Sequence, residues 1–206
     1  MSGAGPRLAV LDYGIGNLRS AEKALQRQGA DARLTTDPAE IEAADGLVLP
    51  GVGHFGSCMR ALVDRGLDRR AHDAIAAGTP FIGICVGAQM LLEGSDEDPE
   101  VPGLGVVPGR VERLPGGVKH PQMQWNRLVV RRPSPMLAGL EEPIWMYFVH
   151  TYAPVTDTGV VATCDYGGEV VAAIEHGRVW ATQFHPEKSG EAGLALLANF
   201  VRSVVS

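Results

Sequence analysis

Short apolar runs alternate with helical patterns over the first 94 residues of the chain. The runs are apolar on both faces, which is typical of strands in a buried parallel sheet, and they lie at 7–12, 32–36, 45–51 and 80–85. Segments with apolar residues at helical spacing follow three of them, each closed by a nearby glycine, at 17–30, 57–78 and 86–94. This alternation predicts βαβ units.

The pattern changes from about residue 105 onward. Strand-like segments now follow one another closely, with Gly, Asp and Pro between them, at 104–114, 127–132, 144–152, 159–166, 169–177 and 178–184. EHGR at 175–178 is typical of a hairpin turn. An amphipathic helix is expected at 190–205, with Ser189 as its N-cap. The second half is therefore predicted to extend the sheet with antiparallel strands.

These elements predict one α/β domain over residues 1–206, with a mostly parallel central sheet flanked by helices and an antiparallel extension. A chain of 206 residues can bury a single core of this size. The net charge is −6 and no lysine or arginine cluster is long, which argues against a nucleic-acid partner. The chain shows no signal peptide and no apolar run that could cross a membrane, so we expect it in the cytoplasm.

Cysteine usage supports the same compartment. The three cysteines are widely spaced and no C-x-x-C occurs, so neither a zinc site nor a disulfide framework is predicted. Cys58 and Cys164 lie in apolar helix and strand patterns and are expected in the core. No histidine and carboxylate residues have metal-ligand spacing, and no cofactor is expected.

Cys85, in FIGICVGAQML at 81–91, is open to two interpretations. Free cysteine is often a buried apolar residue, and this one follows a strand pattern. However, Gly83 and Gly87 flank it, and a strand that turns straight into a helix at such a residue is typical of a nucleophile elbow. A helix N-terminus also favours the thiolate. This segment alone does not decide between the two.

A base and an orienting acid follow in ATQFHPEKSG. His185 comes directly after an apolar strand, and Glu187 lies two residues further on. A carboxylate placed there could hold the imidazole in the right tautomer, as in a nucleophile–base–acid triad. A lone histidine before a proline is more often a loop residue. Together with Cys85, however, the pair favours catalysis.

An oxyanion hole is the third part of such a site. PGVG at 50–53 follows the third strand, and its backbone N–H groups could face a developing oxyanion. The N–H of Val86, just after the nucleophile, is the natural second donor. Without Cys85, the same stretch would be interpreted as an ordinary turn.

These motifs resemble those of the class I glutamine amidotransferases. GICVGAQML matches the nucleophile segment of that family, and QFHPEKSG matches its His–Glu segment. The stretches LDYGIGNLRS, LPGVGHFGS and YFVHTY are similar to those of one group within it, the glutaminase subunits of imidazole glycerol phosphate synthase in histidine biosynthesis. The resemblance covers essentially the whole chain.

The resemblance implies hydrolysis of glutamine to glutamate and ammonia through a glutamyl thioester on Cys85. His185 would transfer protons and Glu187 would orient it. An N–H of Val52 or Gly53 and that of Val86 would form the oxyanion hole. Bound glutamine would be held by the positions Gln89, His150, Thr151 and Tyr152.

The resemblance also implies a partner, a (β/α)8-barrel cyclase subunit in a heterodimer. Ammonia would pass to it internally, and the cyclase would form imidazole glycerol phosphate and an aminoimidazole carboxamide ribotide (AICAR). Family positions near that interface correspond to Asn17 in DYGIGN, Trp125, Asn126, Tyr147 and Lys188. Trp125 and Tyr147 could instead be core aromatics, and Lys188 a solvated charge.

One stretch departs from the family pattern. PQMQWN at 121–126 has Gln122 and Gln124 where the family usually has His and Gly. We treat this stretch as a loop whose backbone a side chain at 124 restricts, which would affect coupling to the partner. Two other functions remain open. One is a glutaminase for another synthase, such as pyridoxal phosphate synthase, and the other is a catalytically silent regulatory subunit.

Overall fold

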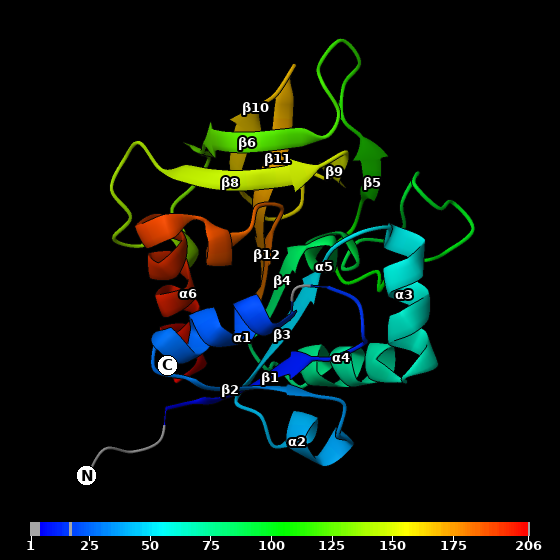
Figure 1. Ribbon diagram of the computed structural model, residues 1–206, viewed down its shortest axis with the longest axis vertical. Helices are drawn as coiled ribbons and strands as arrows, with labels where there is room; N and C mark the ends of the chain where they lie inside the picture. The colour runs from blue at the N-terminus through cyan, green and yellow to red at the C-terminus, as the bar shows by residue number, and fades with distance from the viewer. Residues whose placement is uncertain (1–4, 17, 206) are drawn as a thin grey trace.

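The computed structural model describes residues 5–16 and 18–205. Its largest element is an eight-stranded sheet with the order β2-β1-β3-β4-β12-β11-β10-β7 (Figure 1). The strands are β1 (Arg7–Leu11), β2 (Asp31–Thr35), β3 (Gly46–Gly51), β4 (Phe81–Cys85), β7 (Val129–Val130), β10 (Val160–Asp165), β11 (Glu169–His176) and β12 (Val179–Thr182). Pairing is parallel from β2 to β12 and antiparallel from β12 to β7. The predicted fold class is confirmed.

Helices cover both faces of the sheet. They are α1 (Leu18–Arg27), α2 (Pro38–Glu42), α3 (Phe55–Asp64), α4 (Leu67–Ala76), α5 (Val86–Gln89) and α6 (Gly190–Val204), with 3-10 turns at Pro135–Leu137 and Pro186–Lys188. α1 packs with α6, whereas α4 packs with α2 and α3 (Figure 1). Strand order explains this, because right-handed crossovers that run in opposite directions along a sheet place their helices on opposite faces.

Two further pairs of strands complete the fold. β5 (Arg110–Arg113) pairs with β9 (Tyr152–Val155), and β6 (Gln122–Arg127) pairs with β8 (Trp145–His150). The β6–β8 pair, which we call the β6–β8 ribbon, runs across the end of the molecule opposite α2 (Figure 1).

The parallel strands form the centre of the core. Every residue of β3 and β4 is buried, as expected for strands covered by helices on both faces. β1, β3, β4 and β12 run in the same direction, so their carboxyl ends meet at one edge of the sheet. The strand order reverses at β1 and β3, and ligand sites of open α/β sheets lie beyond the carboxyl ends at such a point.

Several predicted elements differ from those observed. The helical pattern at 57–78 forms two helices, because Gly66 adopts a left-handed φ of 66° between α3 and α4. The helix expected at 86–94 ends at Gln89, and α2 was not predicted. Two predicted strands are shorter than expected. In the segment 104–114 only Arg110–Arg113 forms a strand, and in the segment 127–132 only Val129–Val130 and the last residue of β6 do. The β11–β12 hairpin is confirmed at EHGR.

Candidate active site

Cys85 lies at a sharp turn between β4 and α5. Its φ of 55° and ψ of −113° make it the only residue other than glycine with a positive φ in the described part of the chain. Such strain is common where a structure holds a functional side chain. A Cβ on Gly87 would lie 1.8 Å from the Leu49 oxygen, and one on Gly83 would lie 2.7 Å from the Gly87 oxygen. Both glycines are therefore needed for β3, β4 and α5 to pack.

His185 and Glu187 follow β12, the strand that pairs with β4. The His185 Nδ1 and the Glu187 Oε1 lie 2.8 Å apart, and the two side chains are only 2% and 5% exposed. This bond fixes the tautomer and leaves the His185 Nε2 without a hydrogen-bond partner among the described atoms. Cys85 and His185 line one cavity, so a free imidazole nitrogen and a thiol share it.

The electrostatic surroundings of His185 favour its cation. Burial alone lowers the pKa of His185, but the neighbouring Cys85 sulfur and the Glu187 carboxylate outweigh it and raise that pKa to about 9. The imidazole therefore holds a proton at neutral pH beside the sulfur. A protonated imidazole beside the sulfur suits a cysteine nucleophile, because it stabilises the negative charge that the sulfur carries when it attacks.

Ser189 connects the histidine segment to the β6–β8 ribbon. It lies at the predicted N-cap position of α6, but its hydroxyl makes no capping bond. The hydroxyl instead donates to the His185 carbonyl oxygen at 2.6 Å and accepts from the Tyr147 N–H at 3.0 Å. The His185 N–H in turn donates to the Tyr147 carbonyl oxygen at 3.0 Å. Ser189 thus tethers the base to β8.

A cavity of about 460 Å³ joins most of the predicted site residues. Its volume is within the range of roughly 300–1,000 Å³ that small-molecule pockets have. Its lining is Val52, Gly53, Cys85, Val86, Gln89, Glu97, Pro121, Val149, His150, Thr151, Tyr152, His185 and Lys188. The predicted oxyanion and substrate positions therefore all lie around the thiol, while Glu187 lies behind His185.

Three predicted interface residues, Trp125, Asn126 and Tyr147, do not line this cavity. Trp125 is 48% exposed on the β6–β8 ribbon and packs edge-on against Tyr147, with ring centroids 6.1 Å apart. The Asn126 amide donates to the Asp165 carbonyl oxygen at 2.9 Å. Asn17 lies outside the described residues.

Gln183 and Glu97 belong to the site but were not predicted. Gln183 is 1% exposed, and its Nε2 lies 3.8 Å from the Cys85 sulfur. The Gln89 amide donates both to the Gln183 Oε1 at 3.0 Å and to the Tyr152 carbonyl oxygen at 2.8 Å. A polar residue in the apolar strand segment RVWATQF was the available signal for Gln183. Glu97 gave none, because it lies in an irregular acidic stretch.

The stretch at 121–126 is not the predicted loop. Gln122 to Arg127 form β6, and Gln124 is exposed in an extended strand that needs no glycine. The expected restriction of the backbone by Gln124 is therefore wrong. Gln122 is instead fully buried, and it pairs in register with His150 across the ribbon. Cys58 and Cys164 are buried, as predicted.

His150 is held neutral beside the cavity. Its Nδ1 lies 2.9 Å from the Tyr152 carbonyl oxygen, so this nitrogen carries the proton. Burial, together with the nearby His185, lowers the pKa of His150 to about 4, although the hydrogen bond with Tyr152 partly opposes the shift. A neutral imidazole here leaves His185 as the charged histidine of the site.

This pKa predicts a loss of stability in acid. The folded-state pKa of His150, about 4, lies below its ordinary value of 6.5, so the unfolded chain takes up the proton first. The free energy of unfolding should fall as the pH drops from about 6.5 toward about 4, by about 1.4 kcal/mol per pH unit from this group. Urea unfolding at about pH 7 and about pH 5 measures it. His150→Asn should flatten the slope, whereas His72→Asn, on the exposed side of α4, should not. Equal slopes in all three proteins would contradict the assignment.

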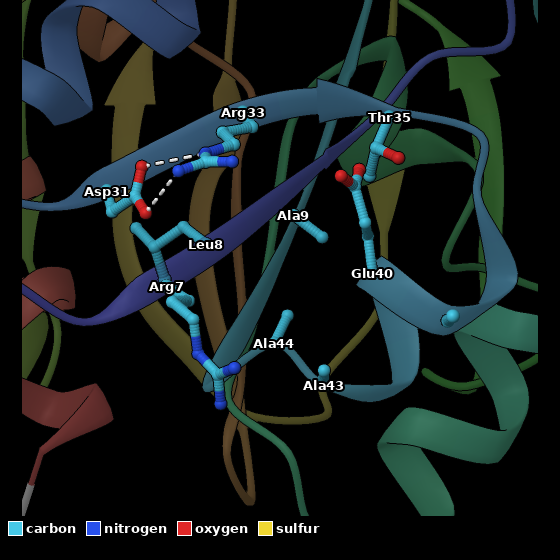
Figure 2. A pocket seen from close by; sticks show the side chains of 10 residues that line it. Arg7, Leu8, Ala9, Asp31, Arg33, Thr35, Glu40, Ala43 and Ala44 are labelled. Carbon is cyan, nitrogen blue, oxygen red and sulfur yellow. Dashed lines mark hydrogen bonds and ion pairs between the residues drawn. The ribbon is translucent and has the colours of Figure 1, made fainter.

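A second cavity of about 320 Å³ lies between β1, β2 and α2 (Figure 2). Its two arginines are already paired, since Arg33 lies 2.9 Å from Asp31 and Arg7 lies 3.7 Å from Asp45. The cavity holds no cysteine or histidine. We therefore assign the chemistry to the cavity at Cys85.

The described residues contain neither a cluster of metal ligands nor a membrane-spanning helix. No group of three or more His, Cys, Asp or Glu side chains there could hold a metal ion. No helix in the same residues is long and apolar enough to cross a membrane.

The sequence matches a known family over almost its whole length. The model of the class-I glutamine amidotransferases matches residues 9–204. The chain belongs to the class I glutamine amidotransferase family. The predicted family is therefore confirmed.

Similar proteins narrow the relationship. The chain is 52% identical over 198 residues to the imidazole glycerol phosphate synthase subunit HisH of Methanothermobacter thermautotrophicus, covering 96% of this chain and 98% of the relative. It is 51% identical over 204 residues to the subunit of the same name from Synechococcus sp., with 96% and 94% covered. Among solved structures, one titled as a glutamine amidotransferase has a TM-score of 0.74 at 25% identity, with 99% and 100% covered. A putative GMP synthase subunit from Thermoplasma acidophilum, 22% identical with a TM-score of 0.77 and 98% and 96% covered, shares the fold.

Proposed function

We propose that this chain is the glutaminase subunit of an imidazole glycerol phosphate synthase. The observation that carries the proposal is the strained Cys85 in one cavity with the buried His185–Glu187 pair. The relatives that are about half identical to the chain over nearly its full length support the choice of synthase.

The reaction begins with attack of the Cys85 sulfur on the side-chain amide carbon of glutamine. The developing oxyanion accepts hydrogen bonds from the N–H of Val86 and from one in PGVG, at Val52 or Gly53. His185 gives its proton to the leaving nitrogen, and ammonia departs from a glutamyl thioester. Water, deprotonated by His185, then hydrolyses the thioester to glutamate and regenerates Cys85.

The charges of the cavity suit glutamine as the substrate. Besides the histidines, its lining holds one acid, Glu97, and one base, Lys188. Glutamine carries one ammonium and one carboxylate group, which these residues can bind. Glu97 is held in place by the Phe55 N–H, which donates to its Oε2 at 2.7 Å.

We propose that a barrel cyclase docks over the β6–β8 ribbon to form a heterodimer. The ribbon exposes large apolar side chains, with Met123 at 62% and both Trp125 and Trp145 at 48%. Ammonia is mostly protonated at neutral pH, so a covered site keeps it from solvent on its way to the cyclase. We also propose that residues 1–206 act as one domain in the cytoplasm, without a cofactor.

Activation by the partner tests this function. Glutamate release by the isolated chain should be slow and should rise about 10- to 100-fold when the cyclase subunit and its nucleotide ligand are added, as for coupling of 1–3 kcal/mol. A coupled glutamate dehydrogenase assay measures it. Activation only by a different synthase subunit would contradict the choice of partner. No glutamate release in any complex would contradict the glutaminase itself.

A further inference from the structure

Two buried side chains that the proposed reaction does not use hold carbonyl groups of the PGVG turn. The Tyr13 hydroxyl, just beyond β1, donates to the Pro50 carbonyl oxygen at 2.6 Å. The Cys58 thiol, in the first turn of α3, donates to the Val52 carbonyl oxygen at 3.4 Å. Tyr13 is 1% exposed and Cys58 is 0% exposed, so both bonds are shielded from water.

Both groups keep their protons at neutral pH and can therefore act as donors. Burial raises the pKa of Cys58 to about 11, although the neighbouring Tyr13 hydroxyl partly opposes the shift. Burial also raises the pKa of Tyr13, and the adjacent Cys58 adds to that effect. The hydroxyl and the thiol thus lie near each other, and each binds a carbonyl oxygen of the turn.

The Tyr13 oxygen lies where the turn meets the nucleophile elbow. A Cβ on Gly51 would lie 2.9 Å from this oxygen and 2.6 Å from the backbone nitrogen of Gly87. No side chain fits at 51 without moving one of them. The Tyr13 oxygen and the Gly87 nitrogen therefore both pack closely against Gly51 of the turn.

A hydrogen bond to the C=O of a peptide unit also orients the N–H of that unit. A peptide unit is planar and trans, so its N–H points away from its own C=O. The bond from Cys58 to the Val52 carbonyl oxygen therefore orients the N–H of Gly53, and the bond from Tyr13 to the Pro50 carbonyl oxygen orients that of Gly51. The unit between them, which carries the N–H of Val52, is flanked by two fixed peptides. Val52 and Gly53 both line the cavity.

We propose that Tyr13 and Cys58 are positioning residues for the oxyanion hole, which set the orientation of the N–H donors in PGVG through its carbonyl groups. This inference rests on the proposed glutaminase function. A donor that is held in place acts mainly on the transition state, so its loosening should lower kcat and leave KM almost unchanged.

The test compares variants in the complex with saturating cyclase subunit and nucleotide. Cys58→Ala and Tyr13→Phe should each lower kcat for glutamate release by about 10- to 30-fold, less than the roughly 100-fold or more expected for direct loss of an oxyanion donor. KM should change less than about two-fold. Cys58→Ser, which keeps a donor, should recover most of kcat. Cys164→Ala, another buried thiol, is the matched control and should behave as the wild type.

A second readout separates positioning from general damage. Alkylation of Cys85 by iodoacetamide forms no oxyanion, so its rate, followed by mass spectrometry of the Cys85 peptide, should be unchanged in both variants. Wild-type kcat in Cys58→Ala and Tyr13→Phe, or an equal loss in Cys58→Ser and Cys58→Ala, would overturn the inference. If Tyr13→Phe does not fold, the test rests on position 58, where Cys58→Val and Cys58→Ala lack a donor and Cys58→Ser keeps one. If the wild-type complex releases no glutamate, the proposed function fails instead.

Discussion

Replacing Cys85 with alanine is expected to lower glutamate release in the complex by at least about 10⁴-fold. The reason is the loss of the only thiol that lines the cavity among the described residues. Cys58 and Cys164 are buried and do not line the cavity, so they cannot substitute for it. The covalent route would be removed as a whole, and only the binding of glutamine would remain.

Two measurements distinguish loss of the nucleophile from loss of the fold. The Cys85→Ala complex should still form the cyclase product when an ammonium salt replaces glutamine, because only the supply of ammonia is lost. Cys164→Ala should retain wild-type glutamate release. A Cys85→Ala protein that still released glutamate would rule out the proposed mechanism and favour direct attack by water.

Replacing Glu187 with glutamine is expected to lower kcat by about 10³-fold while the protein keeps its fold. An amide at the same position can present its NH₂ group to the His185 Nδ1, which favours the tautomer with the proton on the wrong nitrogen. The 2.8 Å bond between two buried groups is the contact that would change. Glu191→Gln, an exposed change in the first turn of α6, is the control and should have no effect.

The pH dependence gives the same variant a second test. In the wild type, proton donation to the leaving ammonia should be lost as the pH rises past the His185 pKa of about 9. That folded-state pKa lies above the ordinary value of 6.5, so its stabilising effect is complete below about 6.5 and is lost as the pH rises toward about 9. In Glu187→Gln the folded-state pKa should fall, so both the loss of proton donation and the loss of this stabilising effect should end at a pH below about 9. An unchanged pH profile would show that Glu187 does not support the cation.

The residues of the site could be predicted where a short segment contains the whole signal. Gly83, Cys85 and Gly87 lie within five positions, and the need for close packing and a strained turn is local. His185 and Glu187 are two residues apart, so their contact depends little on the rest of the fold. Gln183 was missed because its partners, Cys85 and Gln89, come from another part of the chain.

The predicted elements were wrong in segments whose structure depends on the parts of the chain that pack against them. The apolar pattern of 57–78 suited one helix, yet Gly66 turns the chain so that α3 and α4 each pack on the core. The polar residues at 121–126 are typical of a loop, but residues 122–127 pair along their whole length with β8. Ser189 comes directly before a helix, as capping residues do, but its hydroxyl binds the backbone of His185 and Tyr147 instead of capping that helix.

The sequence by itself determined the chemistry, because the thiol, the imidazole, the carboxylate and the glycines that shape the elbow are identities that no fold can change. Its alternation of apolar runs also determined the parallel sheet. Only the tertiary structure decided which groups meet. β12 pairs with β4, which brings His185 beside Cys85, and α3 places Cys58 against the PGVG turn. Hydrogen bonds act over about 3 Å, so the partners of a side chain depend on how distant segments pack.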